Sequence, residues 1–295
     1  MNIYCELRER LKNGPADFYT SSDGFHSFEP RASAMCQRIG LRPMCVILGG
    51  GYVGQAVAKL ASFIEMDTIV VDDRPEFSSK ELFPDALKTI TGDFTKVMSE
   101  LSLSPSACLV ICTRGHQSDL ECLRAGLGKP HQYIGMLGSK AKAGKLFSIL
   151  RDEGISDAKL AEVCAPIGLQ IGSETPSEIA VAVIAQIIEK TKQQNHEFQI
   201  SRTLIDDICT APEGSVVCSI MSTSGSVSRK SGFMLMRPDR TFTGTIGGGQ
   251  VESLATEEAF RMLGTNDKPH FKDFEHNAAD SSCWGTIKVL FEVIR

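Results

Sequence analysis

A run of glycines near residue 50 has the spacing of a phosphate-binding turn. Gly49, Gly51 and Gly54 fit the pattern G-x-G-x-x-G, directly after the apolar run CVIL and directly before an amphipathic helix. In such a turn the first glycine permits a tight bend, the second lets the backbone approach a phosphate at the helix N-terminus, and the third allows close packing of helix on sheet. Asp72 lies 18 residues beyond Gly54, near the distance of about 20 expected for an acid that binds ribose hydroxyls. We therefore predict a nucleotide-like ligand here, with a packing turn that binds nothing as the alternative.

The charges that follow the second apolar run bear on which nucleotide would bind. Arg74 could accommodate a 2′-phosphate, whereas Asp72 would repel one. The pattern favours NAD only slightly over NADP, and both stay open.

Polar residues also follow the apolar run ACLVIC, where ligands of a doubly wound sheet settle. Arg114 and His116 could bind an anionic group or move a proton at this position. A solvated loop in which Arg114 pairs with a surface acid is the alternative.

The last third of the chain holds a second glycine cluster, Gly247–Gly249, which runs into a helix that carries Glu252. Backbone amides of such a cluster can meet an anion, and Arg229 would add positive charge. A bulged hairpin with a mobile turn explains the same residues without a ligand.

Cys283 could be a reactive thiol, although a buried inert thiol is favoured.

The overall composition excludes several classes of protein. A formal net charge of -5 argues against coating nucleic acid or an anionic membrane. No apolar run approaches the roughly 18–20 residues of a membrane span, and the polar start lacks the core of a signal peptide, so we expect a cytoplasmic protein. The ten cysteines contain no C-x-x-C pair and the six histidines do not cluster. We therefore expect no metal site and no disulfide framework.

Two domains account for most of the chain. Over residues 41–192, short apolar runs alternate with helical patterns, which predicts an α/β, Rossmann-like doubly wound parallel sheet that binds a nucleotide. Over 199–295, turns separate strand-like runs, which predicts a smaller α+β domain. These runs are SVVCSIMS, FMLMRP, TFTGTIGGG and TIKVLFEVI. Residues 1–40 begin with a candidate helix around Ile3 to Leu11, and no role is assigned to this N-terminal segment.

These motifs together resemble the XdhC/CoxI family, accessory proteins that mature xanthine dehydrogenase and related molybdenum hydroxylases. The resemblance covers about residues 44–295. It is carried by GGGYVGQAVAKLA, VVDDRPEF, CTRGHQSDLECLRAGL, YIGMLGSKAK, APIGLQIGSETPSEIAVAVIAQII, SVVCSIMSTSGSVSRKSGFMLM and GTIGGGQVES. Two features depart from the family: the small domain usually comes first, and the terminal cysteine is usually followed by glycines, where this chain has Cys283-Trp284-Gly285.

The resemblance implies a chaperone that binds molybdenum cofactor, as molybdopterin or its dinucleotide form. It would assist sulfuration of the cofactor by a cysteine desulfurase and deliver it to an apo molybdenum hydroxylase; a homodimer is left open. The residues implied to hold the cofactor are Gly49, Gly51, Gly54, Asp72, Arg114, His116, Arg229, Gly247, Gly248, Gly249 and Glu252.

Two other functions compete with this one. An NAD(P)-dependent oxidoreductase would use the same turn, with His116 or Lys140 as proton donor, but the second domain shows no Tyr-x-x-x-Lys pair or His/Asp relay. A nucleotide-sensing regulatory module without turnover is the third hypothesis.

Overall fold

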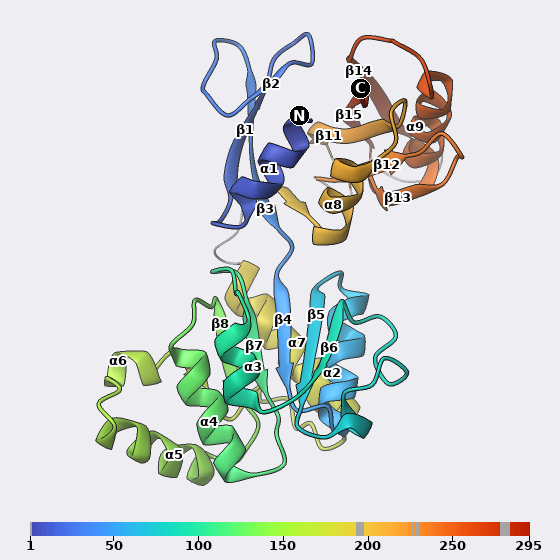
Figure 1. Ribbon diagram of the computed structural model, residues 1–295. Helices are drawn as coiled ribbons and strands as arrows, with labels where there is room; N and C mark the ends of the chain where they lie inside the picture. Colours follow the sequence, from blue (N-terminus) through green and yellow to red (C-terminus); the bar gives the residue numbers. More distant parts are fainter. Residues whose placement is uncertain (1, 193–197, 226, 228–230, 278–283) are drawn as a thin grey trace. The chain divides into compact units, whose positions relative to one another are not determined.

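The computed structural model describes residues 2–192, 198–225, 227, 231–277 and 284–295. Their contacts divide the chain into two units. The central unit is Arg42–Asn195, and the terminal unit combines Met1–Leu41 with His196–Arg295. Figure 1 shows the elements of each unit. No described helix has both the length and the apolar character that crossing a bilayer requires.

The central unit is built on a six-stranded parallel sheet. Its strands are β4 (Met44–Leu48), β5 (Asp67–Asp72), β6 (Lys88–Thr91), β7 (Cys108–Ile111), β8 (Tyr133–Met136) and β9 (Val163–Cys164). They lie in the order β6-β5-β4-β7-β8-β9. With β4 counted as the first strand, this is the Rossmann order 3-2-1-4-5-6. The predicted Rossmann-like α/β fold is therefore confirmed.

Helices cover both faces of this sheet. They are α2 (Tyr52–Phe63), α3 (Phe94–Glu100), α4 (His116–Leu127), α5 (Lys140–Asp152), α6 (Asp157–Leu160) and α7 (Pro176–Lys192), with a 3-10 turn, η1 (Pro75–Phe77). Alternate residues of β4 enter different cores: Cys45 and Ile47 pack with α2 and α7, and Val46 and Leu48 pack with α3, α4 and α5. Because both of its faces are buried, β4 is a continuous apolar run rather than an alternating one.

The terminal unit contains a five-stranded antiparallel sheet in the order β13-β12-β11-β15-β14. Its strands are β11 (Val216–Gly225), β12 (Phe233–Met236), β13 (Phe242–Thr245), β14 (His270–Asn277) and β15 (Trp284–Val293). Helix α9 (Gly249–Met262) packs on it, with Ala255 and Ala259 in one core with Val289. This antiparallel sheet and its helix match the expected α+β pattern, and β14 is an additional strand.

Residues 1–41 are an integral part of the terminal unit. They form α1 (Ile3–Leu11), β1 (Ala16–Thr20), β2 (His26–Ser27) and β3 (Met35–Leu41), and β10 (Phe198–Ile200) completes a sheet in the order β10-β3-β1-β2. Leu7, Phe18 and Ile39 share a core with Ile208 of α8 (Arg202–Thr210) and with Leu235. The segment left without a role in the sequence thus contributes core residues to this unit.

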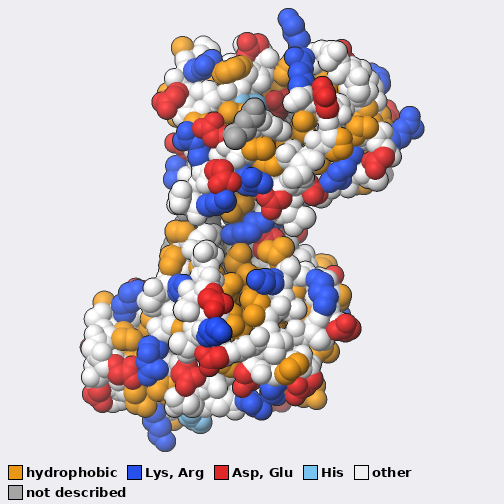
Figure 2. Space-filling model, viewed as in Figure 1, with side chains coloured by type: hydrophobic (Ala, Val, Ile, Leu, Met, Phe, Trp, Pro, Cys, Tyr) orange, Lys and Arg blue, Asp and Glu red, His pale blue; other side chains and the backbone are white. Residues whose placement is uncertain are grey.

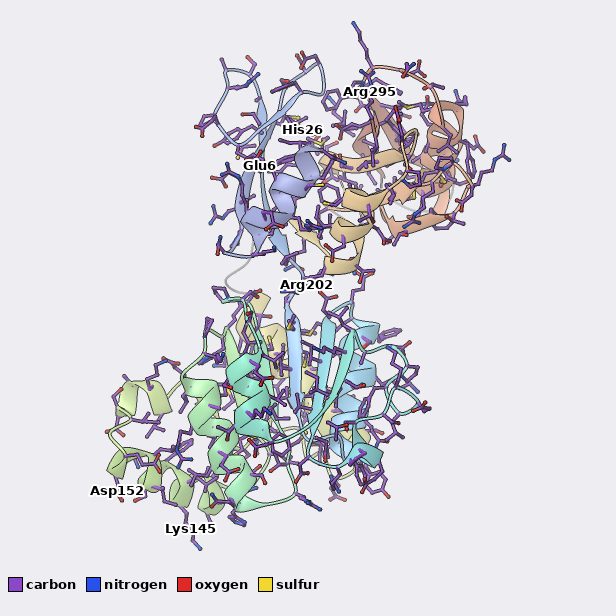
Figure 3. The ribbon with its side chains drawn as sticks, viewed as in Figure 1. Glu6, His26, Lys145, Asp152, Arg202 and Arg295 are labelled. Carbon is purple, nitrogen blue, oxygen red and sulfur yellow. The ribbon has the colours of Figure 1, made fainter. Side chains whose placement is uncertain are left out.

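A buried hydrogen-bond network fastens this N-terminal segment to β15. The Tyr4 hydroxyl donates to Glu292 Oε2 at 2.5 Å, and His26 Nε2 lies 2.7 Å from Glu292 Oε1. His26 is labelled among the side chains in Figure 3. His26 Nδ1 lies 3.0 Å from Thr20 Oγ1. All four residues are buried. Because buried polar groups are costly to leave unpaired, the network fixes α1, β1 and β2 to the last strand.

Candidate functional site

The glycine turn between β4 and α2 is held by close backbone packing. Gly49 has a φ of +115°, and a Cβ there would lie 2.4 Å from the carbonyl oxygen of Cys112. A Cβ on Gly54 would lie 2.0 Å from the Gly49 carbonyl oxygen, and one on Gly50 would lie 1.8 Å from that of Phe77. These three positions therefore require glycine to maintain the fold, whatever the turn binds.

Gly51 differs from its neighbours because a Cβ there would meet nothing within 4 Å. It is the N-cap of α2, without a capping side chain and without an acid in the first helical turn. The first N–H groups of a helix have no partner within the helix, and its dipole favours an anion there. The sequence thus places an open, positively polarised backbone segment at the carboxyl end of β4.

Asp72 holds this turn from the neighbouring strand. Its Oδ2 accepts a hydrogen bond from the Gly50 N–H at 2.8 Å. Arg74 donates to Oδ1 from its backbone N–H at 3.0 Å and from Nε at 2.9 Å, and to Oδ2 from Nη2 at 3.1 Å. Burial raises the pKa of Asp72, but the hydrogen bonds from Arg74 and Gly50 outweigh it and hold the pKa below its usual value.

These contacts give Asp72 a structural task. Asp72 has 1% of its surface exposed, and both of its carboxylate oxygens already accept hydrogen bonds within the chain. The contact between Asp72 and a ribose stays a prediction. The next residue, Asp73, has a side chain that is 39% exposed. Asp73 is therefore the more accessible acid at the end of β5.

Arg114 and His116 lie beside the glycine turn, after β7. Arg114 Nη2 lies 3.3 Å from Asp73 Oδ2. Because β5 and β7 flank β4, this ion pair links the segments on either side of the glycine turn. His116 is the exposed first residue of α4, whose N-cap Gly115 also has open space where a Cβ would lie.

A buried ion pair supports the same loop and was missed in the sequence. Asp119, in the first turn of α4, is fully buried and accepts a hydrogen bond from Thr113 Oγ1 at 2.7 Å. The Lys142 ammonium group pairs with its Oδ2 and also donates to the Leu137 carbonyl oxygen at 3.3 Å. No local sequence pattern signals this pairing, because the two residues belong to different helices.

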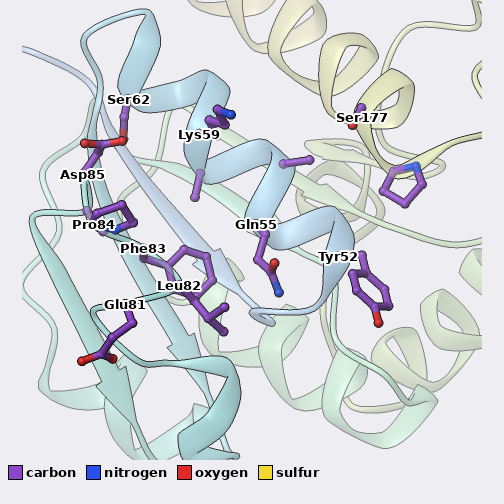
Figure 4. Close-up of a pocket in the computed structure, with 14 residues that line it drawn as sticks. Tyr52, Gln55, Lys59, Ser62, Glu81, Leu82, Phe83, Pro84, Asp85 and Ser177 are labelled. Atoms are coloured by element: carbon purple, nitrogen blue, oxygen red, sulfur yellow. The ribbon is translucent and has the colours of Figure 1, made fainter.

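A cavity of about 580 Å³ runs along the outer side of α2 (Figure 4). It is lined by α2, by residues 81–86 between β5 and β6, and by the first two residues of α7. We call it the α2 cavity. None of the predicted site residues lines it.

Two amides of the second glycine cluster, those of Gly247 and Gly248, already have partners within the chain. Anion binding by this cluster stays a prediction. Glu252 Oε2 accepts hydrogen bonds from the Ile246 N–H at 3.0 Å and the Gly248 N–H at 3.1 Å, and also from the Thr245 hydroxyl. The Gly247 N–H donates to Thr245 Oγ1 at 3.0 Å. Burial raises the pKa of Glu252, but these hydrogen bonds hold it below its usual value.

The structure therefore brings the predicted residues together in two groups. Gly49, Gly51, Gly54, Asp72, Arg114 and His116 meet at one edge of the central sheet, and Gly247, Gly248, Gly249 and Glu252 meet in the terminal unit. Arg229 and Cys283 lie outside the described residues. Within the described ranges, no group of three or more His, Cys, Asp or Glu side chains is arranged to hold a metal ion.

Charges of both signs are interspersed on the face of the molecule shown in Figure 2. That view shows no large patch of a single sign. A nucleic-acid-binding surface would instead gather lysines and arginines over one face.

Two protein families match this chain. The XdhC Rossmann domain matches residues 45–187, which contain the glycine turn and the sheet. The XdhC and CoxI family matches residues 209–274, which contain the second glycine cluster. The Rossmann match precedes the other one along the chain.

Individual relatives match over part of their length. A probable xanthine dehydrogenase subunit of Bacillus subtilis (strain 168) is 31% identical over 166 residues, 56% of this chain and 48% of that protein. The uncharacterized protein YqeB of Escherichia coli (strain K12) is 32% identical over 151 residues, 51% of this chain and 28% of that protein. The chain thus spans less than half the length of these curated relatives.

A solved structure shares the fold. The crystal structure of a xanthine dehydrogenase from Bacillus halodurans aligns with a TM-score of 0.53 and 23% identity. The alignment covers 64% of this chain and 63% of that one.

Proposed function

Because the chain belongs to the XdhC and CoxI family, we propose that it is a maturation factor that binds molybdenum cofactor. It then assists sulfuration of the cofactor and its insertion into a xanthine dehydrogenase-type molybdenum hydroxylase. The partners in this proposal are the apo hydroxylase and a cysteine desulfurase. The name of the Bacillus subtilis relative supports a client of the xanthine dehydrogenase type.

The observation that carries the proposal is the open N-terminus of α2. Molybdopterin has a phosphate, and its dinucleotide form adds a nucleotide. The space at Gly51 and the uncapped first turn of α2 fit such an anion. No acid in that first turn competes for the amides.

Each neighbouring residue has a distinct part in holding the ligand. The amides of the first turn of α2 bind the phosphate, while Asp72 and Arg74 keep the turn in shape. Arg114 is 62% exposed, so its guanidinium group can turn from Asp73 to a bound anion. The cofactor itself supplies the molybdenum that the client enzyme uses.

The test is to identify what the protein retains. The full chain is purified from cells that make molybdenum cofactor and then denatured, and the released small molecules are identified by mass spectrometry. We expect a phosphorylated pterin from the wild type and none from Gly51→Val. A Gly51→Val protein that keeps the pterin would place the site elsewhere.

The same experiment tests the NAD(P)-dependent oxidoreductase. The Rossmann strand order and the glycine turn suit a dinucleotide as well. Release of NAD(H) or NADP(H), without a pterin, would favour that function. NADP(H) is disfavoured relative to NAD(H), because Arg74 is not free to bind a 2′-phosphate. Its side chain is hydrogen-bonded to Asp72 and lies 3.7 Å from the centre of the Phe77 ring.

A further inference from the structure

The α2 cavity has the size and lining of a small-molecule site. Its volume of about 580 Å³ falls within the range of roughly 300–1,000 Å³ typical of ligand pockets. The buried ring of Phe83 lines it together with Ala56, Leu82 and Pro84. An apolar lining of this kind suits a flat ring.

The cavity starts where the glycine turn ends. Tyr52, the first residue of α2, and Gln55, one turn further, both line it. Gln55 Nε2 donates to the Gly50 carbonyl oxygen at 3.1 Å. On the other side of the turn, a Cβ on Gly50 would lie 3.3 Å from Phe83 Cζ. The turn and the cavity therefore share a wall.

The charged groups that line the cavity are two carboxylates and one lysine, and its serine and tyrosine hydroxyls can both donate and accept. Glu81 and Asp85, both exposed, line the end away from Tyr52 (Figure 4). The amide nitrogen of Gln55 spends one of its two hydrogens on the Gly50 carbonyl oxygen, and the Gln55 side-chain oxygen can accept a hydrogen bond from a ligand. Lys59 is the cation among the lining residues. Carboxylates around an apolar lining select a ring that carries N–H donors.

We propose that the α2 cavity is the subsite for a planar heterocycle with an exocyclic amino group, joined to the phosphate at the glycine turn. This rests on the proposed function, which places a phosphate there. Guanine and pterin rings both present the 2-amino-4-oxopyrimidine edge, and we expect the cavity to recognise that edge in either ring. Carboxylates recognise it by accepting hydrogen bonds from its amino and ring N–H groups.

Two nucleotides that differ in one group test the proposal. The full chain is titrated calorimetrically with guanosine 5′-monophosphate and inosine 5′-monophosphate, which lacks only the amino group. We expect the guanine nucleotide to bind about tenfold more tightly, the value of one hydrogen bond to a charged acceptor. The combined change Glu81→Gln and Asp85→Asn removes that preference and leaves binding of the inosine nucleotide nearly unchanged.

Two further variants locate the ring. Ala56→Phe fills the cavity and abolishes the preference, provided that its thermal melt shows a folded protein. Should that variant unfold, the exposed pair Glu81 and Asp85 still decides the question. Lys59→Met, on the same face of α2, is the matched control and keeps the preference.

The outcomes separate this inference from the proposed function. Equal affinities for the two nucleotides, no binding of either, or a preference that survives the change at Glu81 and Asp85 overturns the subsite. Retention of a pterin by wild type and its loss in Gly51→Val test the phosphate site independently of the cavity. Mass spectrometry of the retained molecule distinguishes a pterin from a guanine nucleotide as the natural source of the ring.

Discussion

Replacing Asp72 by asparagine separates a structural role of this carboxylate from a role in binding ribose. Its oxygens accept hydrogen bonds from the Gly50 N–H and from Arg74 without any ligand. A residue that only contacts ribose would leave the stability of the unliganded chain unchanged. The observed contacts predict a loss of stability instead.

The size of the loss follows from the groups left unpaired. Asparagine keeps one acceptor oxygen but puts an NH₂ donor opposite the N–H groups of Gly50 or Arg74. Hydrogen bonds to a charged group contribute about 1.5–3 kcal/mol each, and breaking a buried ion pair costs about 3–5 kcal/mol. The Arg74 side chain is 23% exposed, so water screens part of the loss. We expect Asp72→Asn to lower the free energy of unfolding of the central unit by about 2–3 kcal/mol.

The effect should depend on pH in one direction. The hydrogen bonds hold the pKa of folded Asp72 below its usual value, and an unfolded aspartate titrates near about 3.9. The stabilisation is therefore fully present above about pH 5 and is lost as the pH falls through the folded pKa. Wild type and Asp72→Asn should converge in stability only in acid.

Urea unfolding provides the assay, with far-UV circular dichroism and fluorescence recorded together. The chain has one tryptophan, Trp284, and it belongs to the terminal unit. The fluorescence transition therefore serves as an internal control that should not move. Asp73→Asn, a change at the adjacent exposed acid, is the matched variant and should cost less than about 0.5 kcal/mol. A similarly small loss for Asp72→Asn would refute the structural role and restore the ribose contact as the better explanation.

Four further predictions can be tested by substitution. Gly54→Ala should destabilise the central unit by about 1–3 kcal/mol in thermal melts, because its Cβ would meet backbone at 2.0 Å, whereas Gly51→Val should melt close to wild type. Glu252→Gln should speed hydrogen exchange of the Ile246 and Gly248 amides near neutral pH, because the Glu252 carboxylate accepts their hydrogen bonds. Since the pKa of Glu252 is lowered, the wild-type carboxylate protects these amides above about pH 5 and loses that effect in acid. Asp119→Asn should cost about 3–5 kcal/mol in urea unfolding, since it leaves a largely buried lysine without its partner. Glu292→Gln should lower the free energy of unfolding of the terminal unit by about 1–3 kcal/mol, measured by urea unfolding followed by tryptophan fluorescence, and leave the central unit unchanged.

The central fold was predictable because its signals are local. The inner strands of the parallel sheet, such as Met44–Leu48 and Cys108–Ile111, are short apolar runs, and the glycine turn follows the first of them directly. The continuous burial of Met44–Leu48 explains why that run contains no polar residue. Similar reasoning identified most of the antiparallel strands of the terminal unit. It missed His270–Asn277, an edge strand whose polar residues mask the pattern.

The remainder depends on contacts between residues far apart in sequence. Ile39 pairs with Phe198 in a parallel ladder, and no local pattern announces that partnership. The buried acid and lysine of the central unit belong to different helices, so each resembles an ordinary surface residue in the sequence. The position of Glu252 in the first turn of a helix can be seen in the sequence. Only the folded loop shows that its carboxylate accepts hydrogen bonds from the Ile246 and Gly248 amides.

Among the helices whose caps the structure describes, three begin at a glycine, and their first turns explain why one of them is suited to an external anion. Helix α9, capped by Gly248, carries Glu252, which bonds back to the loop amides. Helix α4, capped by Gly115, carries buried Asp119, whose negative charge lies close to its N-terminus. Helix α2, capped by Gly51, has no acid in its first turn, and the acid that holds its loop comes from the neighbouring strand. A negative charge inside the first turn offsets the positive end of the helix dipole. The N-terminus of α2 therefore keeps both its positive polarity and its open space for a phosphate.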